Sequence, residues 1–136
     1  MRAVVDTNVL AYCLLGTEPF HGEARGFLRR LDEAHAPDSW RVDMLSVMWK
    51  AVAAGAVTAR SAMERLRLAE GLVTHTCPLP LLRDEALGLA VLRSHPAYDT
   101  VFVALAMREG IPLATWDERV LRRFPDVARR PGDLAG

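Results

Sequence analysis

The feature that most constrains this chain is MRAVVDTNVL, its first ten residues, in which a short apolar run ends abruptly in Asp6, Thr7 and Asn8. The run at residues 3–5 predicts a strand that is buried on both faces, because it shows no polar alternation. Ligands of α/β proteins bind at the carboxyl ends of such strands. Asp6 is therefore the first candidate for a functional side chain, and its partners should lie elsewhere in the chain.

The length and composition fit an ordinary globular domain. At 136 residues the chain is about the usual size of one domain, so we expect a single domain over residues 1–136. No apolar run approaches the roughly 20 residues that cross a bilayer, and Asp6 and Asn8 interrupt the first apolar stretch, unlike a signal peptide. We expect a cytoplasmic protein that does not bind a membrane.

The formal net charge of the chain is zero. This balance argues against a protein that coats nucleic acid through sequence-independent electrostatic attraction, but it leaves nucleic acid open as a substrate. Cys13 and Cys77 are isolated in the sequence, which excludes a disulfide framework and a metal site of four thiolates.

Periodicity and turn signals divide the rest of the chain into alternating helices and strands. Strands are expected over residues 72–77 and 111–115, and helices over residues 8–15, 20–31, 40–54, 58–71, 81–94, 99–109 and 117–124. Residues 36–39 predict a turn that starts a helix, and residues 125–136 predict an edge strand or a frayed end. This order indicates a three-layer α/β/α sandwich with a mainly parallel sheet.

The helix over residues 40–54 carries both an apolar and a polar row. Its apolar stripe is expected to consist of Leu45, Met48, Trp49 and Val52. A polar row at helical spacing on an adjacent flank consists of Asp43, Ser46 and Lys50.

Four carboxylates occupy strand ends, a helix start and this helix flank. Asp6 and Asp117 end two apolar strands, Asp99 begins a buried helix, and Asp43 borders the apolar stripe. Converging carboxylates repel one another, so such a cluster makes sense chiefly around a hard divalent cation, for which Mg²⁺ or Mn²⁺ is the natural match. Two such ions about 4 Å apart clamp a phosphodiester during hydrolysis.

Each carboxylate also has an ordinary structural interpretation. The stretch Asp6-Thr7-Asn8 is typical of a turn in which side chains bond their own backbone. Asp99 fits a helix N-cap or a place in the first turn of its helix, and Asp117 fits a residue that stabilises the start of its helix. Asp43 shares its flank with Lys50, which a solvated helix face would explain. A metal site accounts for all four positions together, which none of these interpretations does alone.

The carboxylates lie within recognisable motifs, namely VVDTN at residues 4–8, a helical acid after Ala36-Pro37, AYDT at 97–100 leading into VALA at 103–106, and LATWD at 113–117. Together the motifs resemble the PIN-domain nucleases. In length and layout the chain is most similar to the VapC-type toxins of bacterial and archaeal toxin–antitoxin pairs. The resemblance spans nearly the whole sequence.

The resemblance implies a PIN-like fold and a Mg²⁺- or Mn²⁺-dependent endoribonuclease. It implies that Asp6, Asp99 and Asp117 are metal-site carboxylates with a catalytic role. It further implies that Asn8 and Thr115 are polar supports that orient these carboxylates.

The same resemblance places a fourth acid on the mid-chain helix. The family usually has glutamate where this chain has Asp43, whose side chain is one methylene shorter. Our hypothesis is that Asp43 still serves as a catalytic metal-site residue. RNA as substrate and an antitoxin protein as partner are also implied, and we expect a homodimer.

Other polar and aromatic residues have simpler interpretations. The histidines show no mutual spacing for a metal site or a triad and are interpreted as surface or packed residues: His21, His35, His75 and His95. The late arginines fit an RNA path or, more simply, a solvated face: Arg119, Arg122, Arg123, Arg129 and Arg130. The tryptophans are expected mostly in the core, with the last also a candidate for stacking on a base: Trp40, Trp49 and Trp116.

Three alternative functions remain open at this stage. An aspartyl-phosphate phosphatase uses a strand-end Asp as its nucleophile, but it needs a second acid where this chain has Asn8. A phospho-receiver domain needs a lysine after a late strand, and the only lysine is Lys50 on an early helix. A catalytically weak or degenerate PIN fold that only binds RNA or protein would fit the shortened acid at Asp43.

Overall fold

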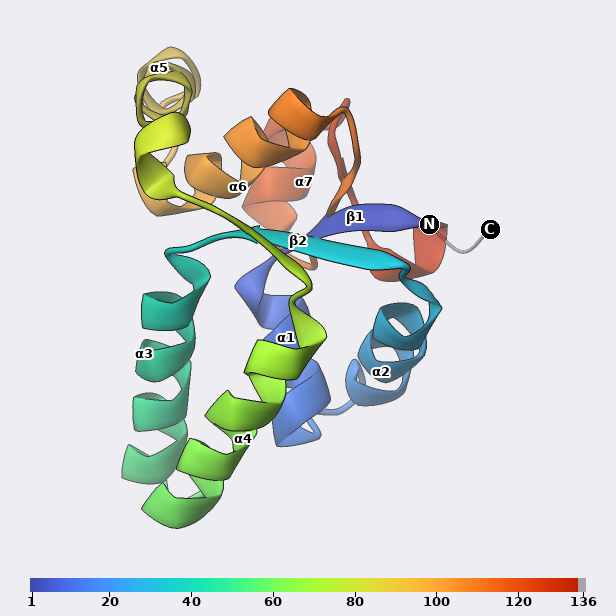
Figure 1. The fold of residues 1–136 in the computed structure, drawn as a ribbon, viewed down its shortest axis with the longest axis vertical. Helices are drawn as coiled ribbons and strands as arrows, with labels where there is room; N and C mark the ends of the chain where they lie inside the picture. Colours follow the sequence, from blue (N-terminus) through green and yellow to red (C-terminus); the bar gives the residue numbers. More distant parts are fainter. Residues whose placement is uncertain (135–136) are drawn as a thin grey trace.

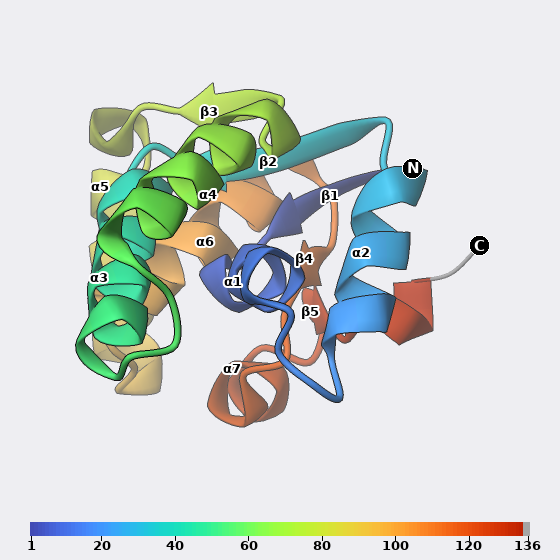
Figure 2. The same cartoon turned by 90° about the horizontal axis from the view of Figure 1, so that it is seen from below.

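The computed structural model describes residues 1–134. Within this range, a parallel five-stranded sheet has the order β3-β2-β1-β4-β5 (Figure 2). Its strands are β1 (Arg2–Val5), β2 (Glu33–Pro37), β3 (His75–Cys77), β4 (Leu113–Ala114) and β5 (Ala128–Arg129). The predicted α/β fold with a parallel sheet is confirmed, and the edge strand expected in the tail is β5.

Helices cover both faces of the sheet, which gives the three layers visible in Figure 1. Their bounds are α1 (Thr7–Leu15), α2 (His21–Arg30), α3 (Trp40–Ala53), α4 (Ala59–Leu72), α5 (Arg83–Arg93), α6 (Ala97–Glu109) and α7 (Glu118–Arg123), with 3₁₀ turns at Leu79–Leu81 and Pro131–Leu134. Helix α6 packs against β1 and β2, and α5 covers α6. Helix α1 packs against α2, α3 and α4 on the other side.

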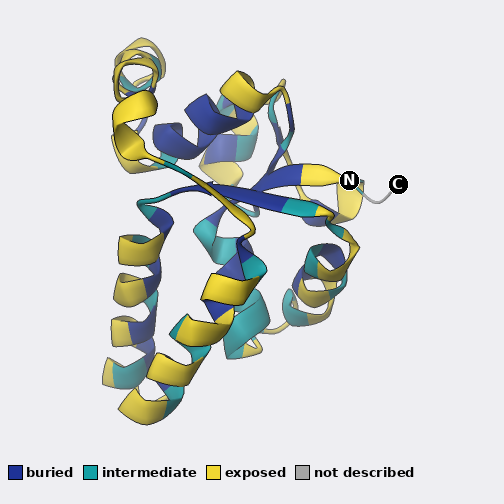
Figure 3. Ribbon diagram, in the orientation of Figure 1, coloured by how far each residue is buried: buried dark blue, intermediate teal, exposed yellow. Residues whose placement is uncertain are grey.

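The core lies on both faces of β1, whose residues Ala3, Val4 and Val5 are fully buried, as their unbroken apolar run predicts (Figure 3). Helix α6 is buried over residues 100–106, because it lies between the sheet and α5. Gly110 ends α6 with a φ of 66°, a left-handed conformation that glycine adopts without a steric penalty.

Strand β2 is absent from the sequence prediction, which assigned residues 36–39 to a turn and helix start. The structure places β2 between β1 and β3, with Ala34, His35 and Ala36 buried. Alanine and histidine are weak strand formers, and the strand's position beside β1 outweighs that local preference.

Several predicted boundaries also shift. Helix α4 continues to Leu72, so β3 begins only at His75. Helix α6 begins at Ala97, which places Asp99 in its first turn while Pro96 occupies the N-cap position. Of the two positions predicted for Asp99, the first turn is therefore confirmed and the N-cap is wrong.

The predicted inner face of α3 is partly wrong. Leu45 and Trp49 were expected inside, but they are 55% and 69% exposed. The buried residues of α3 are Trp40, Met44, Met48 and Ala51. Apolar side chains occur on several faces of this helix, so hydrophobic spacing alone does not select the buried one.

Among the described residues, no helix is both long enough and apolar enough to span a membrane.

Substitutions on the two faces of α3 test this assignment. Met48→Ala should lower the free energy of unfolding by about 2–5 kcal/mol, because it leaves a cavity in the core. Trp49→Ala should change it by no more than about 0.5 kcal/mol, because the indole is mostly exposed. Urea unfolding of both variants measures the difference, and equal losses would contradict the assigned face.

Candidate metal centre

Asp6 lies at the centre of the site because β1 is the middle strand of the sheet. Its backbone N–H donates to the Ala114 carbonyl at 3.0 Å, so the pairing of β1 with β4 continues to this residue. The residue also caps α1, and its Oδ1 accepts from the Thr7 N–H at 2.8 Å. Only 8% of Asp6 is exposed. Strand pairing and helix capping thus fix a nearly buried carboxylate at the carboxyl end of the sheet.

The hydroxyl of Thr115 joins the ends of β1 and β4. Thr115 Oγ1 donates to Asp6 Oδ2 at 2.8 Å and accepts from the Asp117 N–H at 3.0 Å and from Asn8 Nδ2 at 3.1 Å. These three bonds use the one proton and both lone pairs of the hydroxyl. Thr115 is fully buried, so its geometry is held by packing as well.

Asn8 completes the polar support around Asp6. Its Nδ2 lies 3.5 Å from Asp6 Oδ2, and its Oδ1 accepts from the Trp116 N–H at 3.2 Å. The amide therefore links α1 to the segment after β4. Asn8 and Thr115 both contact Asp6, which is the arrangement that their expected role as supports requires.

Asp117 caps α7 with one carboxylate oxygen. Its Oδ1 accepts from the backbone N–H groups of Arg119 at 2.9 Å and Val120 at 3.1 Å. The ordinary interpretation of Asp117 as a helix-start residue is thus correct. It is compatible with metal binding, because Oδ2 accepts no hydrogen bond from the described residues.

Asp99 is held by a histidine that sequence reasoning interpreted as a surface or packed residue. His95 Nε2 lies 2.8 Å from Asp99 Oδ2, and Arg123 Nη1 lies 3.2 Å from His95 Nδ1. Since arginine only donates, Nδ1 accepts and Nε2 carries the proton donated to Asp99. His95 is buried, so it fixes the Asp99 carboxylate from the protein side. The spacing of four residues between the two, across a helix start, is the sequence signal for this pair.

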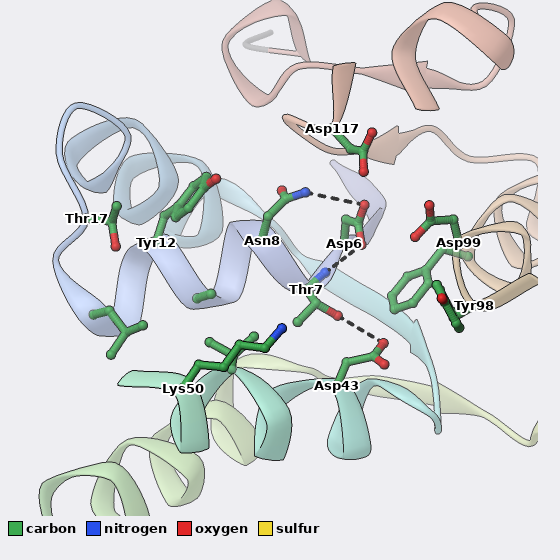
Figure 4. A pocket seen from close by; sticks show the side chains of 14 residues that line it. Asp6, Thr7, Asn8, Tyr12, Thr17, Asp43, Lys50, Tyr98, Asp99 and Asp117 are labelled. Carbon is green, nitrogen blue, oxygen red and sulfur yellow. Dashed lines mark hydrogen bonds between the residues drawn. The ribbon is translucent and has the colours of Figure 1, made fainter. Parts of the chain in front are cut away.

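Asp43 reaches the site from α3. It is half-buried, and its Oδ2 accepts from Thr7 Oγ1 at 3.3 Å. Figure 4 shows Asp43, Asp99 and Asp117 on different sides of Asp6, around one cleft of about 540 Å³ that all four line. The structure therefore brings together the four carboxylates that the sequence singled out.

The electrostatics of the cleft are those of crowded carboxylates. Burial, opposed by the bond from Thr115 and reinforced by the charge of Asp99, raises the pKa of Asp6 to about 7. Burial and the charge of Asp99 also raise the pKa of Asp43. The protein's own groups thus leave the negative charge on Asp6 incompletely offset. An all-oxygen donor set of this kind fits a hard divalent cation such as Mg²⁺ or Mn²⁺.

Two further residues that line the cleft were not predicted as site residues. Lys50 had been assigned to a polar flank, but its ammonium group points into the cleft beside Thr7 (Figure 4). Tyr98 lies at the rim and is 72% exposed. The described residues that line the cleft include none of the five arginines between residues 119 and 130 that were candidates for an RNA path.

Trp116 is not among the described residues that line the cleft, and its ring packs in an aromatic cluster instead. Its ring centroid lies 5.6 Å from that of Tyr12 and 5.3 Å from that of Phe20, and these two rings stack on each other at 4.6 Å. The cluster joins the start of α2 to the segment after β4, which agrees with the expected packing role of this tryptophan.

Carboxylates that gather at the carboxyl edge of a parallel α/β sheet can hold the divalent cations that hydrolytic enzymes use. The sequence profile of the PIN domain matches residues 3–128, and the chain belongs to the PIN domain family. PIN domains are generally nucleases that use divalent metals. No curated protein matches the chain.

The raised pKa of Asp6 predicts how stability varies with pH without metal. Between about pH 4 and pH 7 the folded state holds a proton that the unfolded state has released, so stability should fall as pH rises through this window. The loss should be at most about 4 kcal/mol, since one pKa unit corresponds to about 1.4 kcal/mol. Thermal unfolding in EDTA at several pH values measures it.

Two Asp→Asn variants test whether Asp6 is the group that causes this pH dependence. Asp6→Asn should remove most of this pH dependence and raise stability at pH 8, whereas Asp126→Asn, at an exposed acid outside the cleft, should leave it unchanged. An unchanged slope in Asp6→Asn would show that Asp6 is not the proton-binding group.

Proposed function

We propose that this chain is a Mg²⁺- or Mn²⁺-dependent endoribonuclease and the VapC-type toxin of a toxin–antitoxin pair, with residues 1–136 as one nuclease domain. The observation that carries the proposal is the convergence of Asp6, Asp43, Asp99 and Asp117 on one cleft. The nearly buried Asp6, with its pKa near 7, makes a bound cation the most direct way to keep this carboxylate ionised.

The polar residues of the cleft would have two roles, namely to hold the metal and to orient the residues that hold it. Asp6, Asp99 and Asp117 would hold the metal, and Asp43 would be the fourth acid of the site. The bound ion would supply the charge that polarises the phosphodiester and lowers the pKa of an attacking water. Thr115 and Asn8 keep Asp6 oriented, and His95 keeps Asp99 oriented. Fixed carboxylates lose little free energy to reorganisation when the ion and substrate bind.

RNA would enter along the open side of the cleft. Lys50 places a positive charge among the carboxylates, where it would attract a phosphate oxygen of the backbone. Tyr98 presents an exposed ring at the rim, where it would stack on a base. Both contacts are independent of base identity, so they favour positioning of the strand over sequence recognition.

Exposed apolar side chains support the proposal that this chain binds other proteins. Those on α3 are Val42, Leu45 and Trp49, and those on α5 are Leu87, Val91 and Leu92. The three on α3 follow one another at spacings of three and four residues, so they lie on one face of the helix. Contiguous exposed apolar patches are typical of protein interfaces. We propose an antitoxin and a second copy of this chain as the partners, and the cytoplasm as the place where the enzyme meets RNA.

The second candidate function is a PIN fold that binds RNA or protein without cutting. It is favoured by Asp43, whose side chain is one methylene shorter than the glutamate that PIN-domain nucleases usually have at this position. The nearest polar contact of Asp43 is the long bond from Thr7 at 3.3 Å, which leaves this carboxylate less firmly held than Asp6.

A cleavage assay on purified protein distinguishes the two functions. Labelled single-stranded and structured RNA should be cut with Mg²⁺ or Mn²⁺ and left intact in EDTA. Asp6→Asn should reduce the rate at least about 100-fold, whereas the matched Asp126→Asn should retain it. An intact wild-type digest on every RNA and with either metal would favour the binding module. A stable acyl-phosphate formed from a phosphodonor would instead favour a receiver domain.

Substitution of Asp43 tests its place in the metal site. Asp43→Ala should weaken Mn²⁺ binding and slow cleavage by about 10-fold or more, since even outer contacts of a metal site commonly contribute that much. Asp43→Glu, which restores the missing methylene, should keep both properties. If Asp43→Ala left metal affinity and cleavage unchanged while Asp6→Asn abolished both, Asp43 would lie outside the functional site.

A further inference from the structure

A second group of metal-ligating side chains lies on β2 and β3. The parallel register pairs His35 with His75, and their rings stack with centroids 4.6 Å apart and an interplanar angle of 13°. Glu33 lies two residues before His35 and therefore on the same face of β2. One ligand atom from each of the three residues lies within 4.8 Å of the other two. His35 and His75 show no metal-site spacing in the sequence, but they are neighbours in the sheet. The first is packed and the second lies at the surface.

This cluster is separate from the carboxylate cleft. Glu33 begins β2, whereas the cleft lies at the opposite, carboxyl ends of the strands. None of the three residues is among the described residues that line the cleft. The cluster opens to solvent through His75, which is exposed, and Glu33, which is half-buried.

The surroundings of the cluster already hold its members in place. His35 is buried, and its Nε2 lies 2.7 Å from Glu33 Oε1. The bond with His35, together with the charges of His75 and Arg2, lowers the pKa of Glu33, so this carboxylate is ionised and available as a ligand. Arg2 lies 3.9 Å from the same oxygen, which leaves the second carboxylate oxygen free to turn toward solvent.

Thr74 orients the second histidine. Its Oγ1 lies 2.8 Å from His75 Nδ1, 2.9 Å from the Ala34 N–H and 3.2 Å from the Ala34 carbonyl oxygen. If the hydroxyl proton goes to the carbonyl, the oxygen accepts from both the Ala34 N–H and His75 Nδ1–H. His75 Nε2 then carries the lone pair, as in metal-bound histidines whose other nitrogen donates to an outer partner.

We propose that Glu33, His35 and His75 form a second metal site, specific for Zn²⁺ and similar transition-metal ions. Two imidazoles and one carboxylate are a ligand set that suits zinc, whereas Mg²⁺ prefers oxygen ligands alone. When the ion binds His35 Nε2, the hydrogen in the bond to Glu33 leaves this nitrogen, and the neutral imidazole carries its one hydrogen on Nδ1 instead. Around a tetrahedral ion with bonds of about 2.1 Å, the ligand atoms lie about 3.4 Å apart. The Glu33 oxygen therefore moves away from His35 Nε2, from which it lies 2.7 Å, and the exposed His75 ring turns to close the remaining distance.

The position of the site gives it a structural role. It bridges β2 to β3, the three-residue edge strand of the sheet. A bound ion therefore stabilises the folded state at this edge by linkage, because the unfolded chain does not hold the three ligands together.

Zinc titration of the purified, tag-free chain tests the proposal. The titration is followed by calorimetry in excess Mg²⁺, in an Asp6→Asn background that weakens zinc binding by the carboxylate cleft. One zinc per chain should bind, and both His75→Ala and Glu33→Gln should weaken this binding at least about 10-fold. Added zinc should also raise the Tm of the parent and leave the Tm of His75→Ala unchanged.

The controls keep the result specific. His21→Ala removes a histidine outside the cluster and should bind zinc like the parent, and circular dichroism confirms that each variant is folded. Co²⁺ in place of zinc should give visible absorption bands that disappear in His75→Ala. Zinc binding of unchanged affinity and stoichiometry in both His75→Ala and Glu33→Gln would overturn the proposal, as would a parent protein that binds no zinc.

Discussion

The hydrogen bond from Thr115 Oγ1 to Asp6 Oδ2 is the interaction on which the site depends. It joins the ends of β1 and β4, which are neighbours in the sheet but more than a hundred residues apart in the chain. The same hydroxyl receives the backbone of Asp117 and the amide of Asn8, so one buried oxygen sets the relative positions of two carboxylates. Loss of the hydroxyl would leave Asp6 buried with a poorer set of donors.

Because Asp6 is buried beside other acids, its ionised form destabilises the centre of the fold. Burial and neighbouring acids hold the pKa of Asp6 near 7, so the metal-free protein gains stability when this carboxylate binds a proton. A divalent cation would offset the same cost with more charge. In the proposed enzyme, the crowding that destabilises the empty cleft is what gives it affinity for the ion, a common trade between stability and function.

The sequence predicts the parts of this protein that depend on local pattern. The apolar run before Asp6 and the motif that ends in Asp117 identify central strands and their functional ends. Both can be read locally, because a buried strand is a run of consecutive apolar residues and polar residues follow where it ends. Strand β2 and the pairing of His35 with His75 depend on which strands become neighbours, and no local pattern encodes that. The inward face of α3 was mispredicted for a related reason, since an apolar side chain such as Trp49 fits either the core or a partner surface.

Anomalous scattering from crystals grown with Mn²⁺ is the sharpest test of a metal site at Asp6, because it locates the ion without reference to activity. We expect an anomalous peak in the carboxylate cleft, about 2.2 Å from an oxygen of Asp6 and in contact with Asp99 or Asp117, that is absent in Asp6→Asn crystals. Fully occupied Mn²⁺ elsewhere in the molecule, with no peak beside Asp6, would contradict it.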